Sequence, residues 1–467
     1  MHKKFISLTA VLLVVLAVFS GCDVLTFNSA ENLVRPPRLP GDDGALQSAF
    51  ESAIADEGEY ILRYPTSGEH RSAFVRYDCD GDKSDEAFVF YSLKSEEMSV
   101  NMYFLDYEDG KWIPRETTPG EGNDIHSVEF TDLNDDGISE ILVGWSSLDS
   151  KSNKKLSVYC SGEDKSGMDF KMLVIESYTN MFTVDLDDDG EREILLAYIN
   201  STSDTYTTEA RLLKMSSQGN DYQITAVGQV SLYSEMTAVN SISAGWSMGR
   251  KYVYIDEAAG DTYLTEILYW DNEKNSLSTA FPVDVLSVAG CPTSRSLPLN
   301  CEDVNKDGEI EIPVTKLMKN SSVIRKTLPA DMSASEENIY IISWKKYNGG
   351  DYQTVDSYIS NEDDGFRFRF DDELMADWSV MFYPDECITQ FFMPSGTDND
   401  NPENEIAEKE TDLLFTIKAV PLTETVSVGT YLTSGKDYKY TCEITEVGEN
   451  AGLTRSVIVS YFLPQGV

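Results

Sequence analysis

The sequence predicts a mainly β protein: a β-propeller of about five four-stranded blades, followed by a small α+β domain. Two observations predict this class, an acidic nine-residue cluster that occurs four times and the even spacing of its copies. The clusters cover residues 78–86, 132–140, 185–193 and 303–311, and each runs straight into an apolar, strand-like segment. Radial repetition of one such unit lets every sheet bury both faces and protects its edges.

The spacing also predicts a fifth unit. The clusters begin at residues 78, 132, 185 and 303, in steps of 54, 53 and 118, and the last step is twice 59. Halfway lie residues 244–252, which keep a glycine at position 6, Gly249, and continue into a strand-like run, but have lost every acidic ligand. We interpret them as a unit that keeps the turn without an ion, and six blades remain the alternative.

The N-terminus is typical of a targeting segment. Lys3 and Lys4 precede an apolar run over residues 5–19, which ends at Ser20-Gly21-Cys22. This pattern predicts a signal peptide over residues 1–21, too short for a mature membrane span. Small residues followed by cysteine resemble the bacterial lipobox, which implies lipidation of Cys22. The alternative is a secretory signal with an incidental cysteine.

The remaining boundaries follow from composition and periodicity. Residues 22–43 contain the run Arg-Pro-Pro-Arg-Leu-Pro-Gly-Asp-Asp, and we expect a tether there. The predicted propeller covers residues 44–360 and begins with a short helix, because Leu46, Phe50 and Ile54 recur every four residues and Gly58 closes the segment. Residues 361–467 are predicted to form the small α+β domain, with another blade as the alternative.

Charge excludes some partners. The chain of 467 residues carries 37 basic and 80 acidic residues, a net charge of -43, which opposes binding to nucleic acid. Only three histidines occur, so imidazole-based metal or acid–base sites have little support. Among the cysteines, Cys79 is expected to be a small buried hydrophobe, and only Cys291 and Cys301 are candidates for a disulfide.

The acidic clusters have the composition of a calcium site. Oxygen side chains at positions 1, 3, 5 and 9 of a tight turn are what a hard cation requires. Solvated turns also favour Asp, Asn and Gly, but that alternative does not explain the acid at position 9. An EF-hand would need a bidentate Glu at position 12, where the three best copies have Val143, Leu196 and Val314.

With an acid at position 9 and a strand from position 10, the motif resembles the FG-GAP or VCBS-type repeat of integrin-α-like propellers and of secreted bacterial lipoproteins. The resemblance covers about residues 60–360 and implies up to four structural Ca²⁺ ions, held by side chains at positions 1, 3, 5 and 9 and a carbonyl at position 7. The first copy departs from the pattern, with Gly81 at position 4 and Lys83 at position 6. The implied side-chain ligands are Asp78, Asp80, Asp82 and Glu86; Asp132, Asn134, Asp136 and Glu140; Asp185, Asp187, Asp189 and Glu193; Asp303, Asn305, Asp307 and Glu311. The implied carbonyls belong to Ser84, Ile138, Glu191 and Glu309.

These observations favour a binding or scaffold module on the extracytoplasmic face of a cell membrane, lipid-anchored through Cys22 and presenting a protein or glycan ligand site. The alternative is an extracellular carbohydrate-active enzyme of the glycosidase type, which needs a carboxylate pair outside the four clusters. No nucleophile elbow, His-based triad or phosphate-binding loop occurs in the sequence. The sequence therefore predicts that the chain is not an enzyme.

Overall fold

The computed structural model describes residues 42–147, 150–164, 167–202, 205–218, 221–233, 235–281, 290–325, 338–394 and 411–465. It is built mainly of strands, which confirms the mainly β class that the sequence predicts. The predicted signal peptide, Cys22 and nearly all of the predicted tether lie outside the described residues. Among the described residues, no helix is long and apolar enough to cross a membrane.

The strands form five successive antiparallel sheets, each built from neighbouring strands of the chain. The first contains β1 (Tyr60–Leu62), β2 (Phe74–Tyr77), β3 (Glu86–Leu93), β4 (Asn101–Glu108) and β5 (Lys111–Pro119). The second contains β6 (Asp124–Thr131), β7 (Glu140–Ser147), β8 (Ser150–Asp164) and β9 (Gly167–Tyr178). The third contains β10 (Asn180–Val184), β11 (Glu193–Thr202), β12 (Thr205–Gln218) and β13 (Asp221–Ser231). The fourth contains β14 (Ala238–Ser247), β15 (Arg250–Ala259), β16 (Thr262–Asp271) and β17 (Ser276–Thr279). The fifth is formed by β18 (Glu311–Val323), β19 (Asn338–Tyr347), β20 (Tyr352–Asn361) and β21 (Phe366–Arg369).

The second, third and fourth sheets bury apolar side chains on both faces, because β7, β11 and β15 are apolar at odd and even positions. On β15, Val253 and Ile255 pack against the third sheet, whereas Tyr252 and Tyr254 pack towards the fifth. Side chains on alternate positions of a strand point to opposite faces. Continuous apolar runs therefore mark strands that lie between two neighbours.

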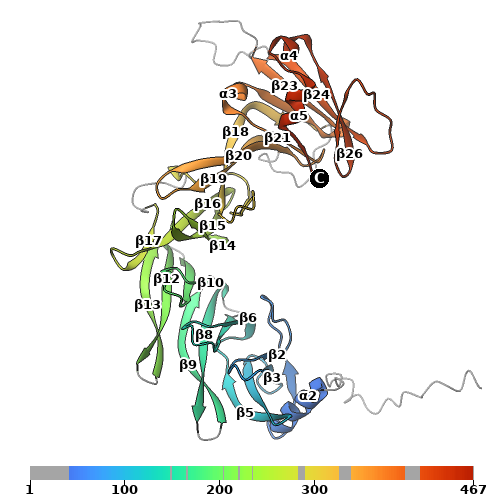
Figure 1. Cartoon of the computed structure of the whole chain (residues 1–467). Coiled ribbons are helices and arrows are strands. Elements are labelled where there is room, and N and C mark those ends of the chain that lie inside the picture. The colour runs from blue at the N-terminus through green and yellow to red at the C-terminus, as the bar shows by residue number, and fades with distance from the viewer. Residues whose placement is uncertain are drawn as a thin grey trace, which may run out of the picture.

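The five sheets follow one another along an open arc, with the first and fifth at its two ends (Figure 1). The helix α2 (Asp42–Ala53) covers the outer face of the first sheet through Leu46 and Phe50, and Ile54, the residue after it, packs in the same core; this confirms the predicted helix and its apolar face. Capped terminal units let an array of repeats end without closing on itself. Several four-stranded antiparallel sheets are confirmed, whereas a propeller and its blade number stay predictions.

The fifth sheet continues into the C-terminal strands to give ten strands in all. The junction is a parallel pairing of Ser322 and Val323 on β18 with Met381 and Phe382 on β22. β21, which follows the predicted boundary at residue 360, pairs with β20. The remaining strands and helices are α3 (Asp372–Met375), β22 (Ser379–Tyr383), η4 (Pro384–Glu386), β23 (Ile388–Pro394), β24 (Thr411–Pro421), β25 (Tyr431–Ser434), β26 (Tyr438–Ile444), α4 (Glu446–Asn450), α5 (Arg455–Tyr461) and β27 (Phe462–Pro464).

The predicted fifth unit is present as the fourth sheet, with a shorter turn than its relatives. Residues 244–252 span the end of β14 and the start of β15, joined by Met248 and Gly249, both with positive φ. Two left-handed residues make the tight hairpin that matches strand twist. The strands therefore extend through the positions that hold acids in the other units.

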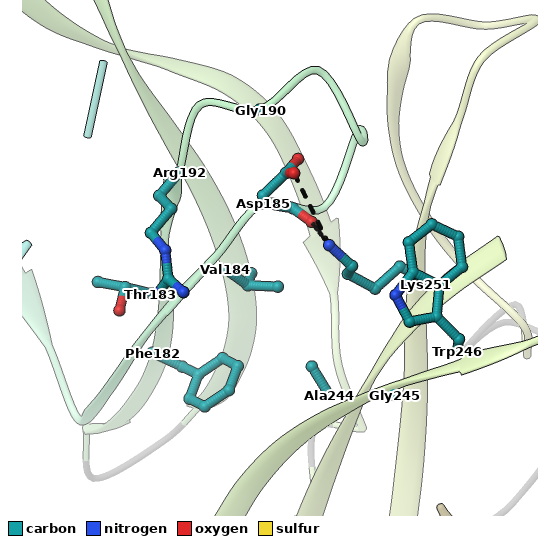
Figure 2. A pocket seen from close by; sticks show the side chains of 10 residues that line it. All are labelled: Phe182, Thr183, Val184, Asp185, Gly190, Arg192, Ala244, Gly245, Trp246 and Lys251. Carbon is teal, nitrogen blue, oxygen red and sulfur yellow. Dashed lines mark hydrogen bonds and ion pairs between the residues drawn. The ribbon is translucent and has the colours of Figure 1, made fainter. Parts of the chain in front are cut away.

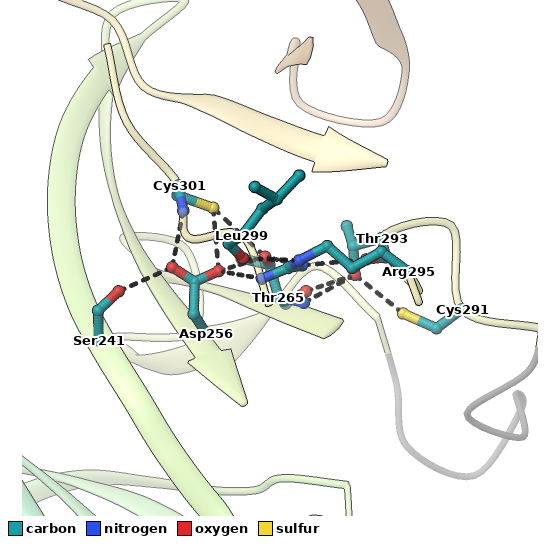
Figure 3. Close-up of polar contacts among 8 residues, drawn as sticks. All are labelled: Ser241, Asp256, Thr265, Cys291, Thr293, Arg295, Leu299 and Cys301. Carbon is teal, nitrogen blue, oxygen red and sulfur yellow. Dashed lines mark hydrogen bonds and ion pairs between the residues drawn. The ribbon is translucent and has the colours of Figure 1, made fainter. Parts of the chain in front are cut away.

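A buried polar cluster fixes the segment that leads from the fourth sheet to the fifth (Figure 3). Arg295 forms an ion pair of 2.8 Å with Asp256, and both side chains are fully buried. Asp256 also accepts hydrogen bonds from Thr265, Ser241 and the Cys301 backbone N–H. These contacts secure the segment to β14, β15 and β16 without a covalent link.

The disulfide considered for Cys291 and Cys301 is wrong, because both are free thiols. Cys291 contacts the Thr293 hydroxyl, and Cys301 contacts the Asp256 carboxylate. The intervening residues instead use the Arg295–Asp256 pair to close the segment (Figure 3). Proximity in sequence is a weak guide to pairing because a disulfide also needs facing Cβ vectors.

Candidate metal centre

The acidic clusters form four turns at the starts of strands β3, β7, β11 and β18, here named turn 1 (78–86), turn 2 (132–140), turn 3 (185–193) and turn 4 (303–311). The glutamate at position 9 is the first residue of its strand in every turn and is at most 2 % exposed. Its Oε2 accepts a hydrogen bond of 2.8–2.9 Å from the backbone N–H at position 2, which belongs to Cys79, Leu133, Leu186 and Val304, respectively. One oxygen of each glutamate is thus fixed by the turn itself.

The residue at position 2 ties each of the first three turns to the neighbouring sheet. Cys79 lies in the core between the first and second sheets, Leu133 in the core between the second and third, and Leu186 in the core between the third and fourth. Cys79 is fully buried, as expected of a small hydrophobe. Order in a turn is therefore coupled to packing between sheets.

All four turns share one backbone conformation. Positions 4 and 6 have positive φ in every copy, including the first, where Gly81 and Lys83 have φ of 78° and 77°. Glycine adopts this region freely, whereas other L-residues do so at a cost. Turn 1 has its glycine at position 4 and not at position 6, yet it keeps the same backbone conformation. The cost of positive φ at position 6 therefore falls on Lys83.

The side chains at positions 1, 3 and 5 fold inward over the turn. In turn 4, Asp303 accepts hydrogen bonds from the Asp307 and Gly308 N–H groups at 3.0 and 2.9 Å. Asn305 accepts a second bond from Asp307 N–H at 2.8 Å, and Asp307 accepts one from Glu309 N–H at 2.9 Å. Turn 2 repeats these bonds with Asp132, Asn134 and Asp136.

The donor sets suit a hard cation. In turn 1, one carboxylate oxygen from each of Asp78, Asp80 and Glu86 lies within 4.8 Å of the others, and Asp185, Asp187 and Glu193 of turn 3 meet the same condition. In turn 4, the buried Glu311 Oε1 has no hydrogen-bond partner among the described residues. A buried acceptor without a donor is costly unless a cation compensates it. All-oxygen sets of this kind are compatible with Ca²⁺.

Burial raises the pKa of the position-9 glutamates. The pKa of Glu86 and of Glu140 rises to about 7, chiefly because burial disfavours the charged form, while the position-2 N–H bond opposes the rise. Burial also raises the pKa of Glu193 and Glu311. A bound divalent cation would favour the ionised form instead.

Turn 3 differs from the others in one contact that the sequence did not reveal. The Lys214 ammonium on β12 reaches Asp187, Asp189 and Glu193. Lys214 lies about twenty residues beyond the turn and reads as an ordinary alternating strand residue. Only the strand register, which pairs Ile194 with Leu213, brings it beside the acids.

A pocket of about 700 Å³ lies between turn 3 and the hairpin of the fourth sheet. Figure 2 shows Arg192 on one side of it and Lys251 and Trp246 on the other. The Lys251 ammonium donates to the Asp185 carbonyl at 2.6 Å and lies 5.0 Å from the centre of the Trp246 ring. Trp246 is 42 % exposed and lines the pocket, with the Lys251 ammonium over its ring.

Comparisons with known proteins assign no family. No protein-family model matches the sequence, and no curated protein matches it. Among solved structures, the chain is similar to the exotype rhamnogalacturonan lyase YesX, at 10 % identity and a TM-score of 0.27, over 73 % of each chain. A likeness this low carries no argument about chemistry.

Proposed function

We propose that the chain is a calcium-stabilised, propeller-like array of sheets that serves as a binding or scaffold module. The observation that carries the proposal is the buried glutamate at position 9 of all four turns, with one oxygen fixed by the turn. The predicted signal peptide and lipidation of Cys22 would place the array on the outer face of a cell membrane. High extracytoplasmic calcium suits modules that bind in the range of about 10⁻⁴–10⁻³ M.

The proposed role of the ion is structural. Calcium would neutralise carboxylates that otherwise repel one another, and a shell filled by protein oxygens leaves no open position for chemistry. The turn residues hold the strand start, and their position-2 side chains hold the next sheet. We therefore expect calcium to act on the stability of sheet packing.

Calcium should raise the melting temperature of the mature protein. A ligand at 100 times its dissociation constant stabilises the folded state by about 2.7 kcal/mol per site. Asp307→Ala removes a candidate ligand of turn 4 and should lose the stabilisation that calcium gives at one site. Asp351→Ala changes an exposed acid outside the turns and should keep the whole calcium-dependent rise in melting temperature. Melting followed by circular dichroism in calcium, magnesium or EDTA measures the effect. Equal melting temperatures in calcium and EDTA would show that the calcium proposal is wrong.

The pocket beside turn 3 is the proposed ligand site. An exposed aromatic face such as Trp246 suits stacking of a sugar ring, and the cations Arg192 and Lys251 suit an acidic substituent. These features favour a glycan that carries carboxylates, in a protein whose net charge of -43 otherwise repels such a ligand.

Trp246→Ala should weaken binding of acidic oligosaccharides at least tenfold, because stacked aromatic contacts dominate small interfaces. Met248→Ala is the matched control, since Met248 is 76 % exposed on the same hairpin and does not line the pocket. A glycan array, followed by titration calorimetry on the hits, measures both. Binding that survives Trp246→Ala unchanged would place the ligand elsewhere.

The enzyme alternative requires an accessible carboxylate pair outside the four turns. Glu257 on β15 and Glu266 on β16 lie close enough for their charges to interact, but both side chains are fully buried and do not meet this requirement. A buried pair cannot meet a polysaccharide. Glu257 and Glu266 are therefore not candidates for a catalytic pair.

A further inference from the structure

Turn 3 already contains a positive charge from the chain itself, the ammonium of Lys214. The Lys214 Nζ lies 2.8 Å from Asp187 Oδ2, 2.6 Å from Asp189 Oδ2 and 2.9 Å from Glu193 Oε1. These acids occupy positions 3, 5 and 9, three of the four side-chain positions that the other turns offer to calcium. The ammonium donates hydrogen bonds to Asp187 and Asp189 and forms an ion pair with Glu193 Oε1.

The strand register explains why this happens in turn 3. Lys214 stands opposite Glu193, one place beyond the paired residues Ile194 and Leu213. The same place is occupied by Asp106 opposite Glu86 in turn 1 and by Cys160 opposite Glu140 in turn 2. An acid or a thiol at this place supplies no positive charge.

Turn 4 also has a lysine at this place but uses it differently. Lys346 pairs directly with Glu311 in the register, yet its ammonium contacts the side chain of Glu309 at position 7. Among the described residues, neither Glu311 Oε1 nor Glu193 Oε1 of turn 3 has a hydrogen-bond partner; the turns differ because Lys214 forms an ion pair with Glu193, whereas Lys346 forms one with Glu309. The candidate ligands of turn 4 are thus still available to an ion.

The surroundings of Lys214 keep its charge in place. Its side chain is only 17 % exposed and Glu193 is fully buried. Burial lowers the pKa of Lys214, but the hydrogen bonds to Asp187, Asp189 and Glu193 outweigh it and leave the pKa above its ordinary value. A calcium ion at the same acids would have to displace this tethered ammonium against like-charge repulsion.

We propose that Lys214 replaces calcium in turn 3. The acids of this turn are then held together without metal, whereas turns 1, 2 and 4 bind the ion. The proposal rests on calcium binding at those turns. The third sheet, at the middle of the arc (Figure 1), would then stay ordered when calcium is scarce. Lys214 thus determines which turns respond to the metal.

Titration calorimetry of the mature protein with CaCl₂ tests the proposal by stoichiometry. The wild type should bind no more than three ions, and Lys214→Gln should bind one more than the wild type. Lys214→Arg, which keeps the positive charge, should match the wild-type number. Lys171→Gln is the matched control, because Lys171 is an exposed strand lysine paired with Asp221, and its stoichiometry should not change.

The outcomes separate this proposal from the calcium proposal itself. If the wild type binds calcium but Lys214→Gln gains no site, or if the wild type binds four ions, Lys214 does not replace the metal. If no variant binds calcium, both proposals fail. Melting curves in EDTA give a second readout: Lys214→Gln should melt below the wild type, and millimolar calcium should restore it, whereas Lys171→Gln should follow the wild type throughout.

Discussion

Arg295→Met should destabilise the protein by about 3–5 kcal/mol, because it leaves the buried Asp256 carboxylate without its counter-ion. The Arg295 guanidinium also donates to Thr265 Oγ1 at 2.9 Å and to the Leu299 carbonyl at 2.8 Å, so the substitution removes several partners at once. The fourth and fifth sheets should separate first, since this cluster holds the segment between them (Figure 3).

Urea unfolding followed by tryptophan fluorescence measures the loss. Arg325→Met is the matched control, because Arg325 pairs with the part-exposed Asp363, and exposed pairs contribute about 0–1 kcal/mol. The double variant Asp256→Asn with Arg295→Met should recover part of the lost stability, because it also removes the unpaired buried charge of Asp256. A cost for Arg295→Met as small as that of Arg325→Met would contradict the assigned role of the cluster.

Glu257→Gln should stabilise the protein above pH 7 and have little effect at acid pH. Burial, followed by the charge of Glu266, raises the pKa of Glu257 well above its ordinary value. Burial raises the pKa of Glu266 from an ordinary 4.5 to about 7, while the Tyr233 N–H bond opposes it. The Asp256 carboxylate adds repulsion at Glu257.

The sign of the pH effect follows from proton binding. Between pH 4.5 and about 7 the folded state holds a proton that the unfolded state releases, so folding loses stability as pH rises through this window. For Glu266 alone the difference is about 3 kcal/mol. Glu257→Gln removes one of the two coupled acids and should flatten the dependence.

Unfolding free energies from pH 5 to 8.5, compared between variant and wild type, measure the effect. Glu273→Gln, at an exposed turn position, is the control and should follow the wild-type curve. A difference between Glu257→Gln and the wild type that stays constant across this range would show that the pair does not share a proton in the folded state.

The repeat could be predicted from the sequence because its determinants are local. Turns rich in Asp and Gly, apolar runs after them and a constant spacing are all visible within one unit, and the face of α2 follows from the four-residue recurrence of Leu46, Phe50 and Ile54. Spacing and Gly249 alone also predict the unit without acids. They do not predict the conformation of its turn, because a glycine at this place is compatible with hairpin loops of more than one length.

The features that were missed depend on distant pairings. Arg295 and Asp256 lie 39 residues apart, and each reads as an ordinary charged residue in an acidic chain. Lys214 reaches turn 3 only through the register of β11 and β12. The open arc depends on which residues cover the outer faces of the first and fifth sheets. These contacts involve segments outside the repeat, so the sequence of one unit does not predict them.

Crystals of the mature protein grown in calcium test the central claim most directly, through anomalous difference density measured at a long wavelength. We expect peaks within the side chains of turns 1, 2 and 4, and Lys214 in place of a peak at turn 3. Absence of density at all four turns would contradict calcium binding, and a peak among Asp187, Asp189 and Glu193 would contradict the role of Lys214.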